Sequence, residues 1–550
     1  MHGSRQAMKR FEHLFLAMVF AVSALVSLLA AEPGITMTGT VMDASSGRPL
    51  PARVYIRSTD GTWFFPKSAS PDGSAVQYRR QVGTASVEMH TTLSAHPFTL
   101  ELPPGRFVFS AEHGKEFLPA EQVVEVGKNP AHVELRLKRW INMAARGWFS
   151  GDTHSHRPLN EMTNALLAED LNLAFPLSHW VTVAEASPKT ANQVRAAVPR
   201  SEVLSLDATH LLYPLNTEYE IFTTGGKAHT LGAFLVIGHK TPFEQGVPPV
   251  AQVLAQARRE GALIDLEKHS WPWSVAMAAV LKVDLFELAN NHVWRTPFGF
   301  PQWTLPAAGK YMNLEMDAHG FTEWGWIDFG FQTYYALLNC GFPIRPTGGT
   351  AAGVHPVPLG FGRVYVRQPD GFAYDKWMAG LKAGHSFVTT GPMLFMQVNG
   401  TQPGDTLRLT PETKTVQLSG SVESASPLER IEIIVNGRVV KNVALSNQKT
   451  PGGAFLNLLA EPVPIERSGW VAVRAFEENQ GRRNRFAHSS PVIIEVPGRP
   501  LRLRREEIDY LLGRVEEEIA RNRGVLSPAA LDEYQQALKI YQAIAEDVRL

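Results

Sequence analysis

The chain has 550 residues, of which 44% are hydrophobic and 19% are charged, so it is too long for one hydrophobic core and is expected to form about three or four domains. Lysine and arginine total 53, and so do aspartate and glutamate. No net charge therefore attracts the protein to nucleic acid or to an anionic membrane surface, and we expect neither as a partner. Cys340 is the only cysteine, which excludes an intrachain disulfide.

The first residues have the pattern of a secretory signal. Lys9 and Arg10 precede an apolar run at 14–29, and small residues follow at 30–31. The run is shorter than the roughly 20 residues that a membrane span usually needs. We therefore predict a signal peptide at 1–31, no stable membrane span after its cleavage, and an exported protein that is periplasmic or extracellular. An uncleaved membrane anchor is the alternative.

Residues 35–139 alternate apolar and polar positions between turns rich in glycine and proline, which is typical of a small β-sandwich. The stretches 38–54 and 102–107 resemble the carboxypeptidase-regulatory-like modules of secreted proteins. That resemblance implies a prealbumin-type fold without catalysis. Because the region contains no cluster of metal-ligand candidates, we expect metal binding to survive its removal.

From 147 to 393 the pattern changes to alternating strands and helices. Strand-like runs at 171–177, 233–237, 262–266 and 283–288 accompany a helical pattern at 250–260. This favours an α/β barrel or a relative of one, whose sites gather at the carboxyl ends of its strands. A second β-sandwich is predicted at 394–497, where Asn-Gly pairs favour hairpin turns, and a helical hairpin at 501–550.

Two histidines lie two residues apart after the first predicted strand of the central region. In an extended segment the side chains of His154 and His156 point to the same side, and neutral imidazole is a common ligand of zinc and similar metals. Other candidates stand at the ends of apolar runs. An isolated histidine is more often structural, but together these residues can hold two divalent ions with a carboxylate between them. The candidate metal ligands are His154, His156, His179, Glu218, His229 and His269.

Catalytic roles are assigned to three residues of this region. Glu218 is expected to bridge the ions, and His269 to act beside them. Asp152 is expected to orient a ligand histidine. Glu220 lies on the same strand face as Glu218 but is expected not to reach the bridging position.

Five segments resemble, in order, the motifs of the PHP (polymerase and histidinol phosphatase) metallohydrolases. Two further segments, 362–366 and 381–392, are similar to the CehA/McbA-type secreted branch. The resemblance implies a distorted (β/α)7 barrel, a site for two or three zinc, manganese or iron ions, and hydrolysis of phosphoesters or, in some members, carbamate esters. The five segments are 151–156, 178–180, 216–220, 229–232 and the single residue His269.

Two segments depart from the family pattern. Ser178-His179 lacks the carboxylate of the usual Thr-Asp-His motif, and 348–353 lacks both metal-binding side chains of Gly-Ser-Asp-x-His. We therefore expect two firmly bound ions at most. Asn291 and His292, which follow the strand-like run at 286–289, or His355, which lies beyond the altered segment, could substitute for the missing ligands, but we interpret them as polar loop residues.

The sequence thus predicts a multidomain α/β plus all-β protein, in which a distorted PHP-type barrel is flanked by two β-sandwiches and a helical hairpin. The predicted function is an exported metal-dependent hydrolase that cleaves phosphoester, or carboxyl or carbamate ester, bonds with a metal-activated water. Tryptophans at 271–326 either stack on a small, carbohydrate-like substrate or pack structurally. The alternative is a secreted binding protein on a degenerate PHP-like scaffold, with little or no catalysis. The sequence sets no oligomeric state.

Overall fold

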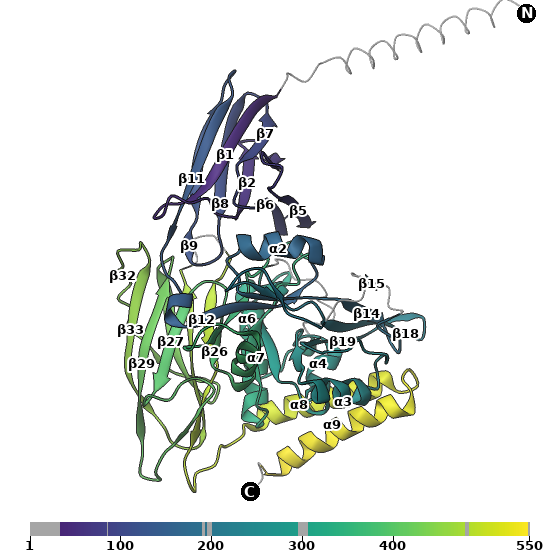
Figure 1. Ribbon diagram of the computed structural model, residues 1–550. Helices are drawn as coiled ribbons and strands as arrows, with labels where there is room; N and C mark the ends of the chain where they lie inside the picture. Colours follow the sequence, from purple (N-terminus) through teal and green to yellow (C-terminus); the bar gives the residue numbers. More distant parts are fainter. Residues whose placement is uncertain are drawn as a thin grey trace, which may run out of the picture.

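The computed structural model describes residues 34–84, 86–189, 193–194, 201–294, 306–478 and 483–547. The predicted signal peptide lies outside these residues. Within them, no helix combines the length and the apolar character that a membrane crossing requires. Figure 1 shows an N-terminal β-sandwich above a central α/β region, with a second group of strands on one side and two long helices beneath. The expected multidomain α/β plus β architecture is confirmed.

Two sheets face each other in the N-terminal module. Buried and partly buried positions alternate along most of β1 and β8, so each of these strands turns one face to the module's core. The first sheet has the order β4 (Lys67–Ser68), β7 (Phe98–Leu102), β1 (Ile35–Asp43), β11 (Ala131–Arg139) and β9 (Phe117–Leu118). The second has the order β10 (Ala120–Val126), β8 (Gly105–Glu112), β2 (Ala52–Ser58), β6 (Ser86–Leu93) and β5 (Ala75–Val82), with β3 (Trp63–Phe64) beside β2.

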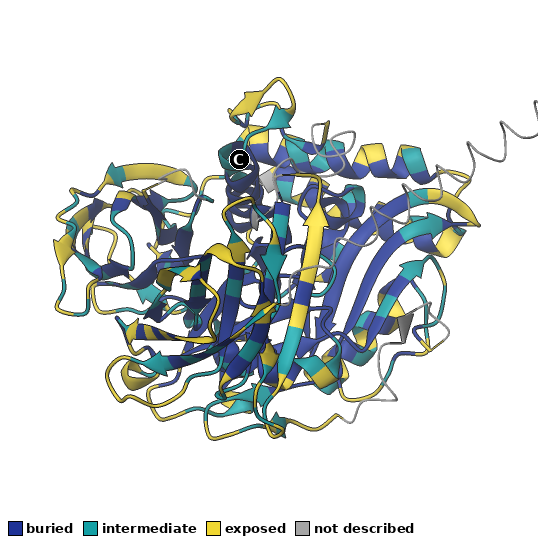
Figure 2. Ribbon diagram, turned by 90° about the horizontal axis from the view of Figure 1, so that it is seen from above, coloured by how far each residue is buried: buried dark blue, intermediate teal, exposed yellow. Residues whose placement is uncertain are grey.

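A long sheet runs through the central region and continues into the C-terminal strands. Figure 2 shows the strands at the centre of the molecule largely in the colour of buried residues. The order is β16 (Leu204–Ser205), β17 (Leu211–Leu212), β13 (Leu173–Pro176), β12 (Trp148–Ser155), β25 (Arg363–Arg367), β26 (Ser386–Thr389), β35 (Phe486–Ser489), β34 (Gly469–Glu477), β30 (Leu428–Val435) and β31 (Arg438–Asn442). Pairing of β26 with β35 joins the two regions. In addition, β36 (Val492–Glu495) pairs with both β34 and β28 (Thr406–Arg408).

A second central sheet consists of seven strands that lie between β14 and β24 along the chain. Its order is β15 (Gln193–Val194), β14 (His179–Val183), β18 (Thr217–Thr224), β19 (Lys227–Ile237), β20 (Leu263–Leu266), β21 (Leu285–Ala289) and β24 (Arg345–Gly348). The smaller sheets are β22 (Met316–Asp317) with β23 (Gly320–Phe321), and β27 (Met393–Val398), β29 (Thr415–Ser424), β33 (Phe455–Pro464) and β32 (Gln448–Lys449).

The strands of the central region, as far as the structure describes them, fall into two separate hydrogen-bonded sheets. In addition, β19 is antiparallel to both β18 and β20. The turn between β18 and β19 contains Gly225 and Gly226, both with positive φ, which a tight hairpin requires and a helical crossover does not. The expected (β/α)7 barrel is therefore not confirmed.

Seven α-helices are described. They are α2 (Leu159–Ala168), α3 (Ala251–Glu260), α4 (Pro272–Leu281), α6 (Glu323–Asn339), α7 (Tyr374–Ala383), α8 (Arg505–Asn522) and α9 (Pro528–Asp547). The apolar stripe of α8, including Ile508 and Val515, is buried in the same core as α4. Glu533 of α9 accepts hydrogen bonds from the backbone N–H groups of Val250 and Ala251, at the N-terminus of α3. The last two helices are thus integrated into the central core.

Buried contacts fasten the N-terminal module to the central region. Arg53 of β2 forms a buried ion pair with Glu169, just after α2. Asn164 of α2 donates a hydrogen bond to the Thr92 carbonyl, over 2.8 Å. Tyr78 of β5 donates to the carbonyl of His355 and accepts from the Gly353 N–H. The module therefore contacts the loop at 353–355, which follows β24.

His488 of β35 is a buried neutral histidine whose titration affects stability. Burial lowers its pKa to about 3, while its Nε2 lies 2.8 Å from the Tyr335 hydroxyl. Below pH 6.5 the unfolded chain binds a proton at this position that the folded chain does not bind, so stability falls as the pH falls from about 6.5 to 3. We expect the wild type to lose about 1.4 kcal/mol per pH unit more than His488→Gln in this window, as measured by denaturant unfolding at pH 7.5, 6 and 5. Parallel stability curves would contradict this.

Candidate metal centre

The end of β12 brings two imidazole rings together. His154 and His156 are both buried, and their Nε2 atoms lie 3.1 Å apart. The two residues occupy alternate positions of an extended segment, which places both side chains on one side.

Glu218 of β18 completes a group of three ligand atoms. Its Oε2 lies 3.1 Å from His156 Nε2, and its Oε1 lies 3.7 Å from His154 Nε2. Ligands bound about 2.0–2.2 Å from a tetrahedral ion are separated by roughly 3.3–3.6 Å. The spacing of these three atoms therefore suits a divalent ion.

Two carboxylates that the sequence analysis did not select also face His154. Glu287 of β21 places Oε1 3.0 Å from His154 Nδ1, and Glu267, directly after β20, places Oε2 3.7 Å from the same atom. A carboxylate on the far nitrogen fixes the orientation and tautomer of a metal-binding histidine. The available signal was a charged residue within or directly after an apolar strand, at 262–267 and 283–288.

The centre contains more buried carboxylates than cations. Oxygen atoms of Glu218, Glu220 and Glu267 lie within 4.8 Å of one another, and Glu287 adds a fourth carboxylate. Lys268 ion-pairs with Glu267, and its Nζ lies 3.0 Å from Glu220 Oε1 and 3.7 Å from Glu218 Oε1. One ammonium does not balance four carboxylates, so the donor set fits an additional divalent cation.

The close packing of buried carboxylates and histidines also shifts the pKa values of these groups. Burial opposes charge on His154, but Glu287, Glu267 and Glu218 outweigh it and raise the pKa of His154 well above its ordinary value. Burial likewise opposes ionisation of Glu218, but His156 and His154 hold its pKa well below the usual range. Burial raises the pKa of Glu220 to about 7, with Lys268 acting in the opposite direction. The centre attracts positive charge to the position between the histidines and Glu218.

Asp152 contacts the backbone rather than an imidazole. Its Oδ1 accepts hydrogen bonds from the N–H groups of His154 and Thr350, and its Oδ2 accepts from the Thr350 hydroxyl and the Gly360 N–H. Asp152 therefore positions His154 through the main chain and fastens the 350–360 loop to β12. Burial raises the pKa of Asp152 to about 6.

The structure does not bring His179 into the centre. In the pairing of β14 with β18, Trp180 is opposite Glu218 and His179 is opposite Thr217. Because side chains alternate along a strand, Trp180 shares the face of Glu218 and His179 lies on the other face. The indole of Trp180 packs 4.7 Å from the His156 ring, between ring centres, and donates a hydrogen bond to Glu220.

Two further expected ligands lie elsewhere. His229 Nε2 lies 2.8 Å from Asn522 Oδ1 and 3.2 Å from Arg521 Nη1, at the end of α8. The ring of His269 is buried among Phe286, Trp326 and Phe329. Burial alone lowers the pKa of His269 to about 3, and neither nitrogen has a hydrogen-bond partner among the described residues.

The neighbouring polar and aromatic residues also have defined places. Asn291 and His292 are buried, and His292 packs against Trp326. Trp271, Trp273 and Trp326 are also buried, so they pack within the protein. Trp324 packs against Phe476, and the side chains of Trp294 and Trp303 lie outside the described residues.

The loop at 350–356 links the N-terminal module to His156. The Ala352 carbonyl accepts a hydrogen bond from the His156 N–H, while Tyr78 bonds Gly353 and His355 in the same loop. We expect Tyr78→Phe to lower unfolding stability by about 1–3 kcal/mol, because the Gly353 N–H loses its acceptor, and to weaken metal binding measurably. Calorimetric titration with Zn²⁺ and thermal unfolding check this. Tyr55→Phe, in the same module but bonded to Glu88, should leave metal affinity unchanged; equal effects of both variants would refute the link.

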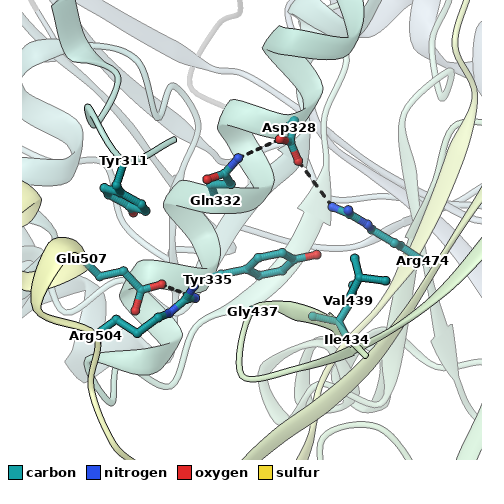
Figure 3. A pocket seen from close by; sticks show the side chains of 10 residues that line it. All are labelled: Tyr311, Asp328, Gln332, Tyr335, Ile434, Gly437, Val439, Arg474, Arg504 and Glu507. Carbon is teal, nitrogen blue, oxygen red and sulfur yellow. Dashed lines mark hydrogen bonds and ion pairs between the residues drawn. The ribbon is translucent and has the colours of Figure 1, made fainter. Parts of the chain in front are cut away.

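A cavity of about 250 Å³ lies between α6, α8 and the C-terminal strands. Figure 3 shows Arg474 and Arg504 among its lining side chains, together with the acidic side chains of Asp328 and Glu507. Arg474 pairs with Asp328 and Glu432, and Arg504 pairs with Glu507. Because both arginines are neutralised by neighbours, this cavity offers no unbalanced charge comparable to that of the histidine centre.

Comparison with known proteins gives little further information. No known family and no curated protein matches the chain. Among solved structures, one that is similar to this chain belongs to a two-domain protein from Bacteroides vulgatus, which is described as containing a predicted PHP-like metal-dependent phosphoesterase. The identity is 10%, the TM-score is 0.28, and the match covers 60% of this chain and 90% of that one.

Proposed function

We propose that this chain is a divalent-metal-dependent hydrolase that acts on phosphoester bonds or on carboxyl or carbamate ester bonds. The observation that carries the proposal is the convergence of His154 Nε2, His156 Nε2 and the Glu218 carboxylate at 3.1–3.7 Å, with all three side chains buried. Buried carboxylates in excess support it further, because an uncompensated charge cluster is costly without a cation. The PHP assignment, its CehA/McbA-type branch and the barrel topology rest on the sequence motifs.

The surrounding residues suit such chemistry. A divalent ion at this position would supply a Lewis acid and would lower the pKa of a bound water. Glu287 holds the ring of His154 through Nδ1. Glu267 Oε1 has no hydrogen-bond partner among the described residues, so this atom is available to accept a proton from the attacking water. Lys268 holds the other oxygen of Glu267 in place.

Export and a small-molecule substrate are part of the same proposal. Export is supported by the basic and then apolar N-terminus, and a small substrate by the burial of the ligand side chains. The rival function is binding without turnover on the same scaffold. It is distinguished by whether metal-loaded protein turns substrates over.

The test combines metal analysis with a substrate screen. Chelator-treated protein is refilled with Zn²⁺, Mn²⁺ or Fe²⁺, and each form is assayed on aryl phosphomonoesters, phosphodiesters, carboxyl esters and carbamates. We expect metal-dependent turnover of at least one class, which His154→Ala abolishes. His385→Ala is the matched control, because that histidine pairs with Asp405 at the surface. Full metal loading without turnover would support the binding protein, and failure to take up metal would refute the centre.

A further inference from the structure

Lys268 occupies the position beside the histidine centre where a second cation would be expected. It directly follows Glu267 after β20, and it is only 3% exposed. Its Nζ contacts oxygen atoms of Glu267, Glu220 and Glu218. The ammonium lies over the ring of Trp271, with Nζ 5.2 Å from the ring centre. The ammonium is therefore held by a cation–π contact as well as by the carboxylates.

Glu218 connects the two cation positions. Its Oε2 faces His156 Nε2 at 3.1 Å, while its Oε1 lies 3.7 Å from both His154 Nε2 and Lys268 Nζ. A carboxylate shared in this way has the arrangement of a bridge between two cations. On one side of the bridge the partners are imidazoles, which bind metal. On the other side the partner is an ammonium, which excludes a second ion by occupying the space and by repelling positive charge.

We propose that Lys268 serves as a built-in second cation, so that the centre binds a single divalent ion between His154, His156 and Glu218. This rests on the proposed metal centre and replaces the expectation of two ions. The carboxylates of Glu220 and Glu267 then share a cation that the protein itself supplies. A substrate anion would meet one metal ion and one fixed ammonium, two cations of different chemistry on either side of Glu218.

Metal stoichiometry of the full chain tests this without any activity assay. Chelator-treated wild type titrated with Zn²⁺ should bind one ion per chain, as measured by calorimetry and by metal analysis after gel filtration. Lys268→Met removes the ammonium but keeps an unbranched stem, and it should bind a second ion, for two per chain. Lys268→Arg retains the positive charge and should stay at one. The matched control is Lys441→Met, which breaks a peripheral ion pair with Glu461 and should also stay at one.

Spectroscopy on Mn²⁺ gives an independent readout. Wild type should show the electron paramagnetic resonance signal of an isolated ion, and Lys268→Met the broadened signal of two coupled ions. Two ions in the wild type, one ion in folded Lys268→Met, or two in Lys268→Arg would each overturn the role of Lys268. The wild-type count decides the matter even if the methionine variant does not fold. No bound ion in the wild type would instead overturn the proposed metal centre.

Discussion

Glu218→Gln is expected to abolish firm metal binding and, with it, hydrolysis. The substitution keeps the volume of the side chain but removes the charge that faces His154, His156 and Lys268. Substituting a residue that only orients a ligand typically costs about 10–100-fold in metal affinity, and we expect loss of this shared ligand to exceed that range. Calorimetric titration with Zn²⁺ and metal analysis measure the change.

Glu220→Gln is the matched control for this variant. Glu220 lies two residues along β18, on the same face, and contacts Trp180 and Lys268 rather than the histidines. A glutamine there can still accept a hydrogen bond from either partner, so the loss of metal affinity should be clearly smaller. Unchanged metal content in Glu218→Gln, or equal losses in both variants, would show that Glu218 is not a ligand.

Asp152→Asn is expected to destabilise the folded protein and weaken metal binding, while leaving the turnover rate of the metal-loaded fraction nearly intact. The Asp152 carboxylate accepts four hydrogen bonds from His154, Thr350 and Gly360. An amide would direct N–H groups at some of these donors, and leaving buried donors without acceptors costs about 1–3 kcal/mol each. We therefore expect a loss of about 3 kcal/mol or more in the free energy of unfolding.

The measurement separates a positioning role for Asp152 from a catalytic one. Denaturant unfolding gives the stability change, and turnover at saturating Zn²⁺, divided by bound metal, gives the chemical effect. Thr350→Val removes the hydroxyl that donates to Asp152 over 2.6 Å and accepts from the Ala352 N–H, but it leaves the backbone N–H donors to Asp152 in place, and it should cost about 1–2 kcal/mol. A stable Asp152→Asn protein with full metal and greatly reduced turnover would instead favour direct participation in the reaction.

Local periodicity in the sequence was enough to identify part of the centre. His154 and His156 are two residues apart in an extended segment, and so are Glu218 and Glu220. A period of two places each pair on one face whatever the rest of the fold does. In a helix the corresponding period is 3.6 residues, and it places the apolar stripe of α8 on one side, where Ile508 and Leu511 are buried.

The tertiary structure decided which strand faces point toward the metal centre. The register of β14 against β18 turns Trp180, and not His179, toward Glu218. After β20, Lys268 points to the carboxylates while the adjacent His269 points into an aromatic core. Both residues follow the end of β20 in the sequence. Their position relative to the strand therefore could not show which of them faces the carboxylates.

The carboxylates around His154 come from strands that are distant in sequence. Glu287 is 133 residues from His154 along the chain, yet its carboxylate lies 3.0 Å from Nδ1. The two residues belong to different sheets, β21 and β12, and only the packing of one sheet against the other sets their distance. The sequence by itself determined which side chains share a local face, because that depends on backbone geometry alone. The tertiary structure decided which of these faces surround one position, because that depends on strand register and sheet packing over the whole chain.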